Sequence, residues 1–211
     1  YLRYGSKALN FRRFNPQQDY NMPLLEEVVA YAAQPENTGN PAMQIYLHIW
    51  LSLQQPDDET HFEGLKSLLM QYHYLFTRPE AEEMFVFAHN YCIGKLNKGQ
   101  QRYLRELFDL YRFEMEHGII NPQETLSASV YRNIITIAQL LGEWVWMEDF
   151  INNFRQAVGE DTYIFNLARL RFLQKRYTQT VELLQNRQDR FGDVLMLLAA
   201  KSLQLKALYE L

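Results

Sequence analysis

The sequence predicts an all-α protein: a right-handed α-α superhelix, that is, a solenoid of antiparallel helical hairpins. Three observations lead to this fold class. Apolar residues recur at the 3.6-residue spacing of amphipathic helices along nearly the whole chain, and no convincing alternating strand interrupts them. Pro, Gly, Asn and Asp cluster at short breaks, which makes successive helices antiparallel neighbours. Two stretches in the C-terminal half repeat one pattern at a fixed offset.

The breaks divide the chain into ten expected helices. The segment before them, residues 4–14, has no clear secondary-structure assignment. We expect helices near residues 23–33, 41–55, 58–76, 80–96, 99–117, 122–141, 143–157, 160–175, 177–188 and 192–210. The widest break, residues 34–41, is rich in Pro, Gly and Asn and reads as a loop too short to separate domains.

Signals at the helix ends support this division. Prolines at 41, 79 and 122 suit a first helical turn, where the missing N–H costs nothing. Acidic runs at 57–59 and 80–83 favour the positive N-terminal end of a helix. Glycines at 118, 142, 159 and 192 fall where helices are expected to end. The β-branched run Ile134–Ala138 lies inside a longer helical period and is expected to be buried helix.

Composition restricts the classes of function. The chain has 211 residues, 47% of them hydrophobic, which is ample for a buried core. Its formal net charge of -4 gives no positive field for nucleic acid, so no nucleic-acid partner is expected. No run approaches the roughly 18 apolar residues that span a bilayer, so no membrane association is expected. The single cysteine, Cys92, favours the cytoplasm mildly.

We expect one α-helical repeat domain over residues 1–211, with irregular hairpins in 1–128 and regular repeats in 129–211. The chain starts at Tyr1 and stops at Leu211 without a helix stop signal, so we expect a fragment of a longer protein whose last repeat is cut off. The unpaired apolar run Val194–Ala200 is then an expected association site.

The repeat itself spans Leu140–Asp161 and Leu173–Val194, which align without a gap. The matching pairs are 33 residues apart: Leu140 with Leu173, Trp144 with Tyr177, Ile151 with Leu184, Asn153 with Asn186, and Gly159 with Gly192. Extending upstream pairs Asn133 with Asn166 and Ile134 with Leu167, which adds the preceding helix. The unit is therefore a helix–turn–helix with a period typical of solenoid repeats.

These residues resemble the tetratricopeptide repeat family, most clearly over residues 129–211. Leu167 and Ala168 stand at the small-residue pair of the first helix, Tyr177 at the aromatic of the turn, and Leu184 at the large apolar position of the second helix. Gly142 and Trp144 occupy the corresponding turn one unit earlier, and Ala199 would fill the small slot of a third copy.

The resemblance implies that first helices line a concave groove that binds a peptide or protein segment. It places Arg132, Asn133 and Thr136 from one unit and Phe165, Asn166, Arg169 and Phe172 from the next in this groove. In family members that hold a C-terminal carboxylate, Asn and basic residues do so; here Asn133 and Asn166 with Arg132 and Arg169 are the candidates. The alternative is that these are ordinary exposed side chains.

No catalytic chemistry is expected. His89 and Cys92 share a helix face, but no second pair completes a zinc site, so a partly exposed His89 and a buried Cys92 are expected instead. The aromatic runs 72–76 and 85–91 are expected in the core, and the acidic runs serve as helix caps. No phosphate loop, nucleophile elbow or HExxH motif is present. We therefore expect no enzyme, no cofactor and no metal site.

The leading functional expectation is a non-catalytic interaction scaffold. The alternative is a helical regulatory or sensor domain within a larger multidomain protein. The identity of the partner and the biological process are not readable from the residues.

Overall fold

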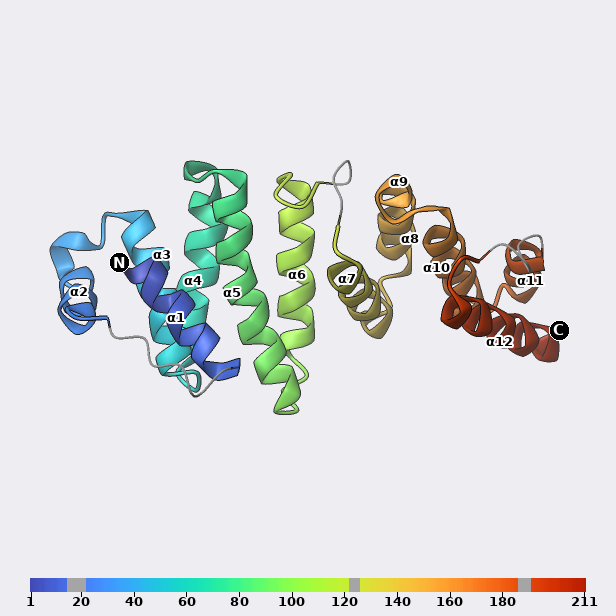
Figure 1. The fold of residues 1–211 in the computed structure, drawn as a ribbon, viewed down its shortest axis with the longest axis horizontal. Helices are drawn as coiled ribbons and strands as arrows, with labels where there is room; N and C mark the ends of the chain where they lie inside the picture. The colour runs from blue at the N-terminus through green and yellow to red at the C-terminus, as the bar shows by residue number, and fades with distance from the viewer. Residues whose placement is uncertain (15–21, 122–125, 186–190) are drawn as a thin grey trace. The chain divides into compact units, whose positions relative to one another are not determined.

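The computed structural model describes residues 1–14, 22–121, 126–185 and 191–211, and every regular element in that part of the chain is a helix (Figure 1). The all-α prediction is confirmed. The described residues pack as two compact units, Tyr1–Ile119 and Ile120–Leu211. The superhelical arrangement stays a prediction. So does the single domain with irregular hairpins in residues 1–128 and regular repeats in 129–211.

The first unit is a stack of helices that follow one another along the chain (Figure 1). They are α1 (Leu2–Phe14), α2 (Leu25–Ala32), the 3-10 turn η1 (Pro35–Asn37), α3 (Pro41–Gln54), α4 (Glu59–Tyr72), the 3-10 turn η2 (His73–Leu75), α5 (Arg78–Asn97) and α6 (Tyr103–Glu116). Contacts join α1 with α3, α3 with α4, α4 with α5, and α5 with α6. Their facing sides bury large apolar side chains, among them Ile49, Phe62, Phe85 and Leu107. Removal of this apolar surface from water is the main force that holds the stack.

Capping side chains fix where these helices begin. The Asn40 side chain accepts the backbone N–H of Met43 at 3.1 Å, just ahead of Pro41. Asp58 accepts the N–H of Thr60 at 3.0 Å. Glu80 accepts the N–H of Thr77 at 3.2 Å. The expected capping role of the acidic runs is thus confirmed at Asp58 and Glu80, and Pro122 lies outside the described residues.

Several helix boundaries differ from the expected ones. The unassigned start of the chain forms α1. The helix expected at 99–117 begins only at Tyr103, because Gly99 adopts a left-handed φ of 84° that closes α5. The helix expected at 143–157 divides at Phe154 into α8 and α9. Apolar periodicity continues through the break at Phe154, whereas the helical backbone conformation does not.

The second unit contains the repeat. Its helices are α7 (Ala128–Leu141), α8 (Trp144–Asn153), the short α9 (Arg155–Val158), α10 (Glu160–Leu173), α11 (Tyr177–Gln185) and α12 (Val194–Glu210). Contacts join α7 with α8, α8 with α10, α10 with α11, and α12 with both α10 and α11. The run Ile134–Ala138 is buried helix, as expected.

Buried positions in this unit recur at the 33-residue offset. The pairs Ile135 and Ala168, Ile137 and Leu170, Met147 and Thr180, and Ile151 and Leu184 are buried in both copies. One position differs from expectation in the possible third copy: Ala199 is exposed, and its neighbour Ala200 is buried instead, at 3% exposure. The two hairpins therefore bury equivalent faces.

The turn between the two helices of each hairpin also recurs. After α7, the N–H of Glu143 donates to the carbonyl of Ala138 at 2.9 Å, and Gly142 has a φ of 72°. After α10, the N–H of Arg176 donates to the carbonyl of Arg171 at 2.8 Å, and Lys175 has a φ of 59°. Both are Schellman motifs, which need one left-handed residue. The second copy places a lysine where the first has glycine.

This difference predicts a stabilising substitution. Lys175→Gly should raise the free energy of unfolding by about 0.5–1 kcal/mol, because glycine adopts a left-handed φ without the steric cost that a Cβ brings. Gly142→Ala should lower it by about 1 kcal/mol for the same reason. Urea denaturation of both variants measures the two shifts, and shifts of the same sign would contradict the equivalence of the turns.

Candidate functional site

The structure places the seven predicted groove residues on α7 and α10. Arg132 and Asn133 are exposed on α7, and Thr136 is half-buried. On α10, all four predicted residues are half-buried: Phe165, Asn166, Arg169 and Phe172. Each of the two helices begins a hairpin, α7 with α8 and α10 with α11.

A cavity of about 540 Å³ brings four of the seven residues together. Its walls come from α7, α9, α10, α12 and the residues just before α7. They are Leu126, Ser127, Ala128, Tyr131, Arg132, Ile135, Ala157, Val158, Thr162, Phe165, Asn166, Arg169 and Met196. Asn133, Thr136 and Phe172 do not line it; the Phe172 ring packs edge-on against Tyr177 instead, with centroids 5.5 Å apart. We call this cavity the groove cavity.

The polar groups of the groove cavity are those that attract an anion. Two of its lining residues, Arg132 and Arg169, are cationic, and none of the described lining residues is acidic. Neither guanidinium lies in an ion pair with any described residue. The side-chain amide of Asn166 already makes one hydrogen bond within the protein, because its Nδ2 donates to the carbonyl of Thr162 at 2.8 Å. A ligand with a carboxylate would therefore meet two arginines with which no described acidic side chain competes.

The apolar part of the groove cavity contains residues that the sequence analysis missed. Tyr131 and Ile135 lie one helical turn apart on α7, so the helical period could have added them to Arg132. Val158 and Met196 come from α9 and α12. No spacing rule connects them with α7, because tertiary packing alone brings them there.

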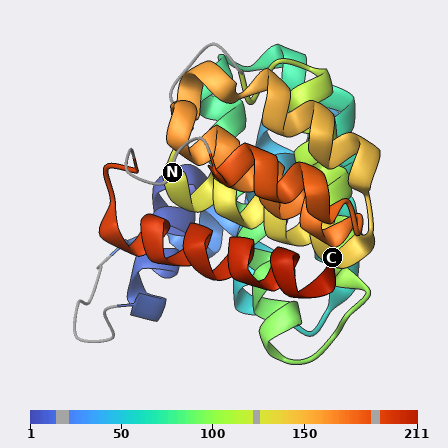
Figure 2. The same ribbon diagram turned by 90° about the vertical axis from the view of Figure 1, so that its right-hand side faces the viewer.

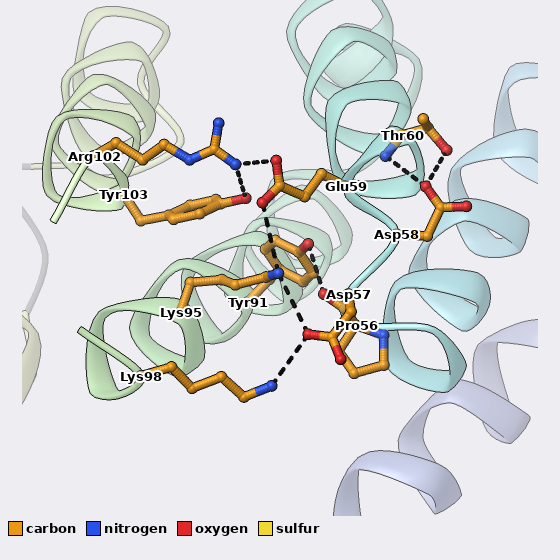
Figure 3. A network of polar contacts seen from close by, with 10 residues as sticks. All are labelled: Pro56, Asp57, Asp58, Glu59, Thr60, Tyr91, Lys95, Lys98, Arg102 and Tyr103. Carbon is orange, nitrogen blue, oxygen red and sulfur yellow. Dashed lines mark hydrogen bonds and ion pairs between the residues drawn. The ribbon is translucent and has the colours of Figure 1, made fainter. Parts of the chain in front are cut away.

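A second cluster of polar residues, at the start of α4, serves as an ion-pair network (Figure 3). Lys95 on α5 is 4% exposed, and its Nζ lies 3.7 Å from carboxylate oxygens of both Asp57 and Glu59. The same Nζ lies 5.4 Å from the ring centroid of Tyr91 and 5.9 Å from that of Tyr103. In Figure 3 the ammonium points toward both carboxylates, beside these rings.

Cations on neighbouring helices complete this network. Arg102 also donates to Glu59, and this hydrogen bond is the main cause that lowers the pKa of Glu59. Lys98 Nζ lies 3.3 Å from Asp57. Acid–base catalysis needs a carboxyl pair whose pKa values are driven apart. Here both carboxylates are paired with cations, so the arrangement fits a tie between α4, α5 and α6.

The prediction for His89 is wrong, whereas that for Cys92 is confirmed. His89 is 7% exposed, and its Nε2 lies 2.5 Å from a carboxylate oxygen of Glu114 on α6. Burial raises the pKa of Glu114, and His89 opposes this shift only in part. Cys92 is fully buried, and burial raises the pKa of its thiol. His89 and Glu114 are thus enclosed where α5 packs on α6.

The aromatic runs are divided between core and surface. Phe85, Phe87 and Tyr91 on α5 are buried, as expected. Tyr74, in contrast, is 68% exposed, so the core expectation is wrong at this position. These aromatic residues do not line the groove cavity.

α12 exposes several large apolar side chains (α12 is red in Figure 2). They are Val194, Leu195, Leu198, Leu205, Leu208 and Tyr209. The helix also buries Ala200 and Ala207. The expected exposure is confirmed at Val194, Leu195 and Leu198, whereas Met196 and Leu197 pack against a core cluster that contains Ala200. Association through this end stays a prediction.

Within the described residues, no group of three or more His, Cys, Asp or Glu side chains is placed to hold a metal ion. None of the helices described is both long enough and apolar enough to cross a membrane. No family model, curated protein or solved structure matches the chain.

Proposed function

We propose that this chain is a non-catalytic interaction scaffold of the tetratricopeptide-like solenoid class, which binds a segment of a partner protein in the groove between α7 and α10. The groove cavity carries the proposal: first helices of two consecutive hairpins line it, and it holds two arginines that have no acidic partner among the described residues. Its volume of about 540 Å³ lies in the range of ligand sites.

The repeat supports the solenoid part of this proposal. Buried positions and both Schellman turns recur 33 residues apart, and each helix from α8 onward packs on neighbours in the chain. Stacked hairpins that each contact only their neighbours form solenoids, and their curvature creates concave binding surfaces. The scaffold belongs to the cytoplasm in this proposal, since its single cysteine requires no oxidising compartment.

The charge and polarity of the groove cavity define the class of ligand. Arg132 and Arg169 select a carboxylate, which we take to be the C-terminal carboxylate of a chain. Ile135, Phe165 and Met196 provide apolar surface for a large aliphatic or aromatic side chain beside it. The proposed ligand is therefore a peptide segment in which an apolar residue adjoins a carboxylate.

Two pools of acetylated random hexapeptides test the proposal, one with free C-terminal carboxylates and one amidated. Wild-type protein should retain members of the free-carboxylate pool preferentially. Arg132→Ala and Arg169→Ala should each weaken the tightest retained peptide about tenfold, because each removes a charge-assisted hydrogen bond. Fluorescence anisotropy measures the affinities, and circular dichroism checks that helicity is unchanged.

The matched control is the double variant Arg176→Ala with Lys206→Ala. It removes two exposed cations of the same unit that do not line the groove cavity. This control should bind like wild type. Equal retention of both pools, or an equal loss in the control, would show that net charge rather than the groove attracts the peptides.

A further inference from the structure

Two histidine rings meet where α4 and α6 end. His73 is the C-cap residue of α4, and His117 is the C-cap residue of α6. Their ring centroids lie 4.8 Å apart, with an angle of 75° between the ring planes. Both rings also pack on Phe113, whose ring centroid lies 5.1 Å from that of His73 and 3.9 Å from that of His117. Helix packing thus brings together two imidazoles that are far apart in the sequence.

One nitrogen of each ring is hydrogen-bonded to the backbone. His73 Nδ1 lies 3.2 Å from the carbonyl oxygen of Met70, and His117 Nδ1 lies 2.9 Å from that of Phe113. A carbonyl oxygen can only accept a hydrogen bond, so each Nδ1 carries a proton and is the donor. In the neutral ring the free lone pair then lies on Nε2. Histidines that bind metal ions are oriented in this way, by a hydrogen bond from the other ring nitrogen.

The two Nε2 atoms have no hydrogen-bond or ion-pair partner among the described residues. The nearby His89 differs, because its Nε2 lies 2.5 Å from a carboxylate oxygen of Glu114. His117 is exposed. His73 is half-buried, but its unpaired Nε2 remains accessible to solvent. An ion from solution can therefore reach both rings.

The spacing of the rings and the charge at the helix ends fit a metal ion. Two imidazoles bound to one tetrahedral Zn²⁺, with Zn–N distances of about 2.0–2.1 Å, have ring centroids roughly 5 Å apart. The C-terminal ends of both helices carry partial negative charge, which favours a cation. We propose that His73 and His117 bind Zn²⁺, or another divalent transition-metal ion that imidazole prefers, through their Nε2 atoms.

This site supplies two protein ligands and leaves the other coordination positions of the ion to water. The bound ion joins the ends of α4 and α6, and it stabilises the folded state because the unfolded chain has no preformed site. The two histidines lie in the first unit, whereas the groove cavity lies in the second. The metal site is therefore independent of the proposed peptide binding.

Titration of the full chain with zinc chloride, followed by calorimetry, tests the proposal. Wild type should bind one Zn²⁺ per chain. His73→Gln and His117→Gln should each weaken the affinity at least tenfold, since each removes one of two protein ligands. A Zn²⁺ concentration about tenfold above the measured Kd should raise the unfolding midpoint of wild type by about 3–6 °C. Mg²⁺, which prefers oxygen ligands, should not raise it.

The matched control is His61→Gln on α4. His61 is the other histidine of this helix that lies near a second imidazole, with its ring centroid 6.0 Å from that of His48. This variant should bind Zn²⁺ like wild type. Each variant is compared with itself in the presence and absence of Zn²⁺, so that any change in its basal stability cancels. Circular dichroism checks that the helicity of each variant is unchanged.

The other outcomes would overturn the proposal. A wild-type chain that binds no Zn²⁺ would show that the two rings serve only helix capping and packing. Unchanged affinity in either His73→Gln or His117→Gln would show that the two rings do not share one ion. An equal loss in His61→Gln would assign the ion to His48 and His61 instead.

Discussion

Replacing Glu114 by alanine should lower the free energy of unfolding of the Tyr1–Ile119 unit by about 3 kcal/mol or more. Glu114 is 2% exposed, and its carboxylate is the hydrogen-bond partner of the equally enclosed His89. Removal of one member of a buried pair leaves the other without compensation and opens a cavity where α5 packs on α6.

Urea denaturation of the full chain measures this loss, and hydrogen exchange in α5 and α6 assigns it to the first unit. Glu116→Ala on the same helix is the matched control, because the Glu116 side chain is 59% exposed in a 3.6 Å pair with Arg112. An exposed pair of this kind contributes about 0–1 kcal/mol. Similar losses in both variants would show that the burial of Glu114 has no energetic consequence.

The same pair predicts a dependence of stability on pH. The pKa of Glu114 is raised by burial, so the folded state holds its proton more tightly than the unfolded state does. The stabilisation from this shift is fully present below the ordinary glutamate pKa of about 4.3 and is lost as pH rises through the folded pKa. Glu114→Gln should therefore match wild type near pH 4 and gain stability relative to it at higher pH.

The sequence predicted the helices well, because apolar spacing reports directly which helix face is buried. Its errors lie where backbone conformation overrides that spacing. Residues 97–102 contain no large apolar side chain, so apolar spacing does not locate a helix start there; Gly99 in a left-handed conformation ends α5, and α6 begins only at Tyr103. The apolar period does run through 154, where the structure divides α8 from α9. This second break leaves almost no trace in the apolar pattern.

Tertiary contacts explain which parts of the candidate site could be predicted. The resemblance to the tetratricopeptide family suggested Arg132, Phe165, Asn166 and Arg169, and these four residues line the groove cavity. Met196 on α12 joins them only through the packing of α12 on α10 and α11. The pairing of His89 with Glu114 arises likewise from the packing of α5 on α6. A single sequence contains no spacing rule for contacts between helices.

The second large effect is expected at Gly64, where α4 meets α3. A Cβ added at this position would lie 2.5–2.8 Å from three atoms of the His48 ring, closer than non-bonded atoms approach. The ring is partly buried, and burial is the main cause that lowers the pKa of His48. Because the ring fills the space above Gly64, a larger side chain must push it, or α3 itself, outward. Gly64→Leu should therefore destabilise the first unit by about 3 kcal/mol.

Substitution of Gly94 on α5 provides the control, because it is expected to change the free energy of unfolding in the opposite direction. An added Cβ there would have no neighbour within 4 Å, and the residue is exposed in the last part of its helix. Gly94→Leu should thus raise the free energy of unfolding by about 0.5–1 kcal/mol, since leucine has the higher helix propensity. Urea denaturation of both variants separates packing from propensity. If both substitutions stabilised the chain, helix propensity would outweigh packing at Gly64, and α3 and α4 could not lie as close together as the structure places them.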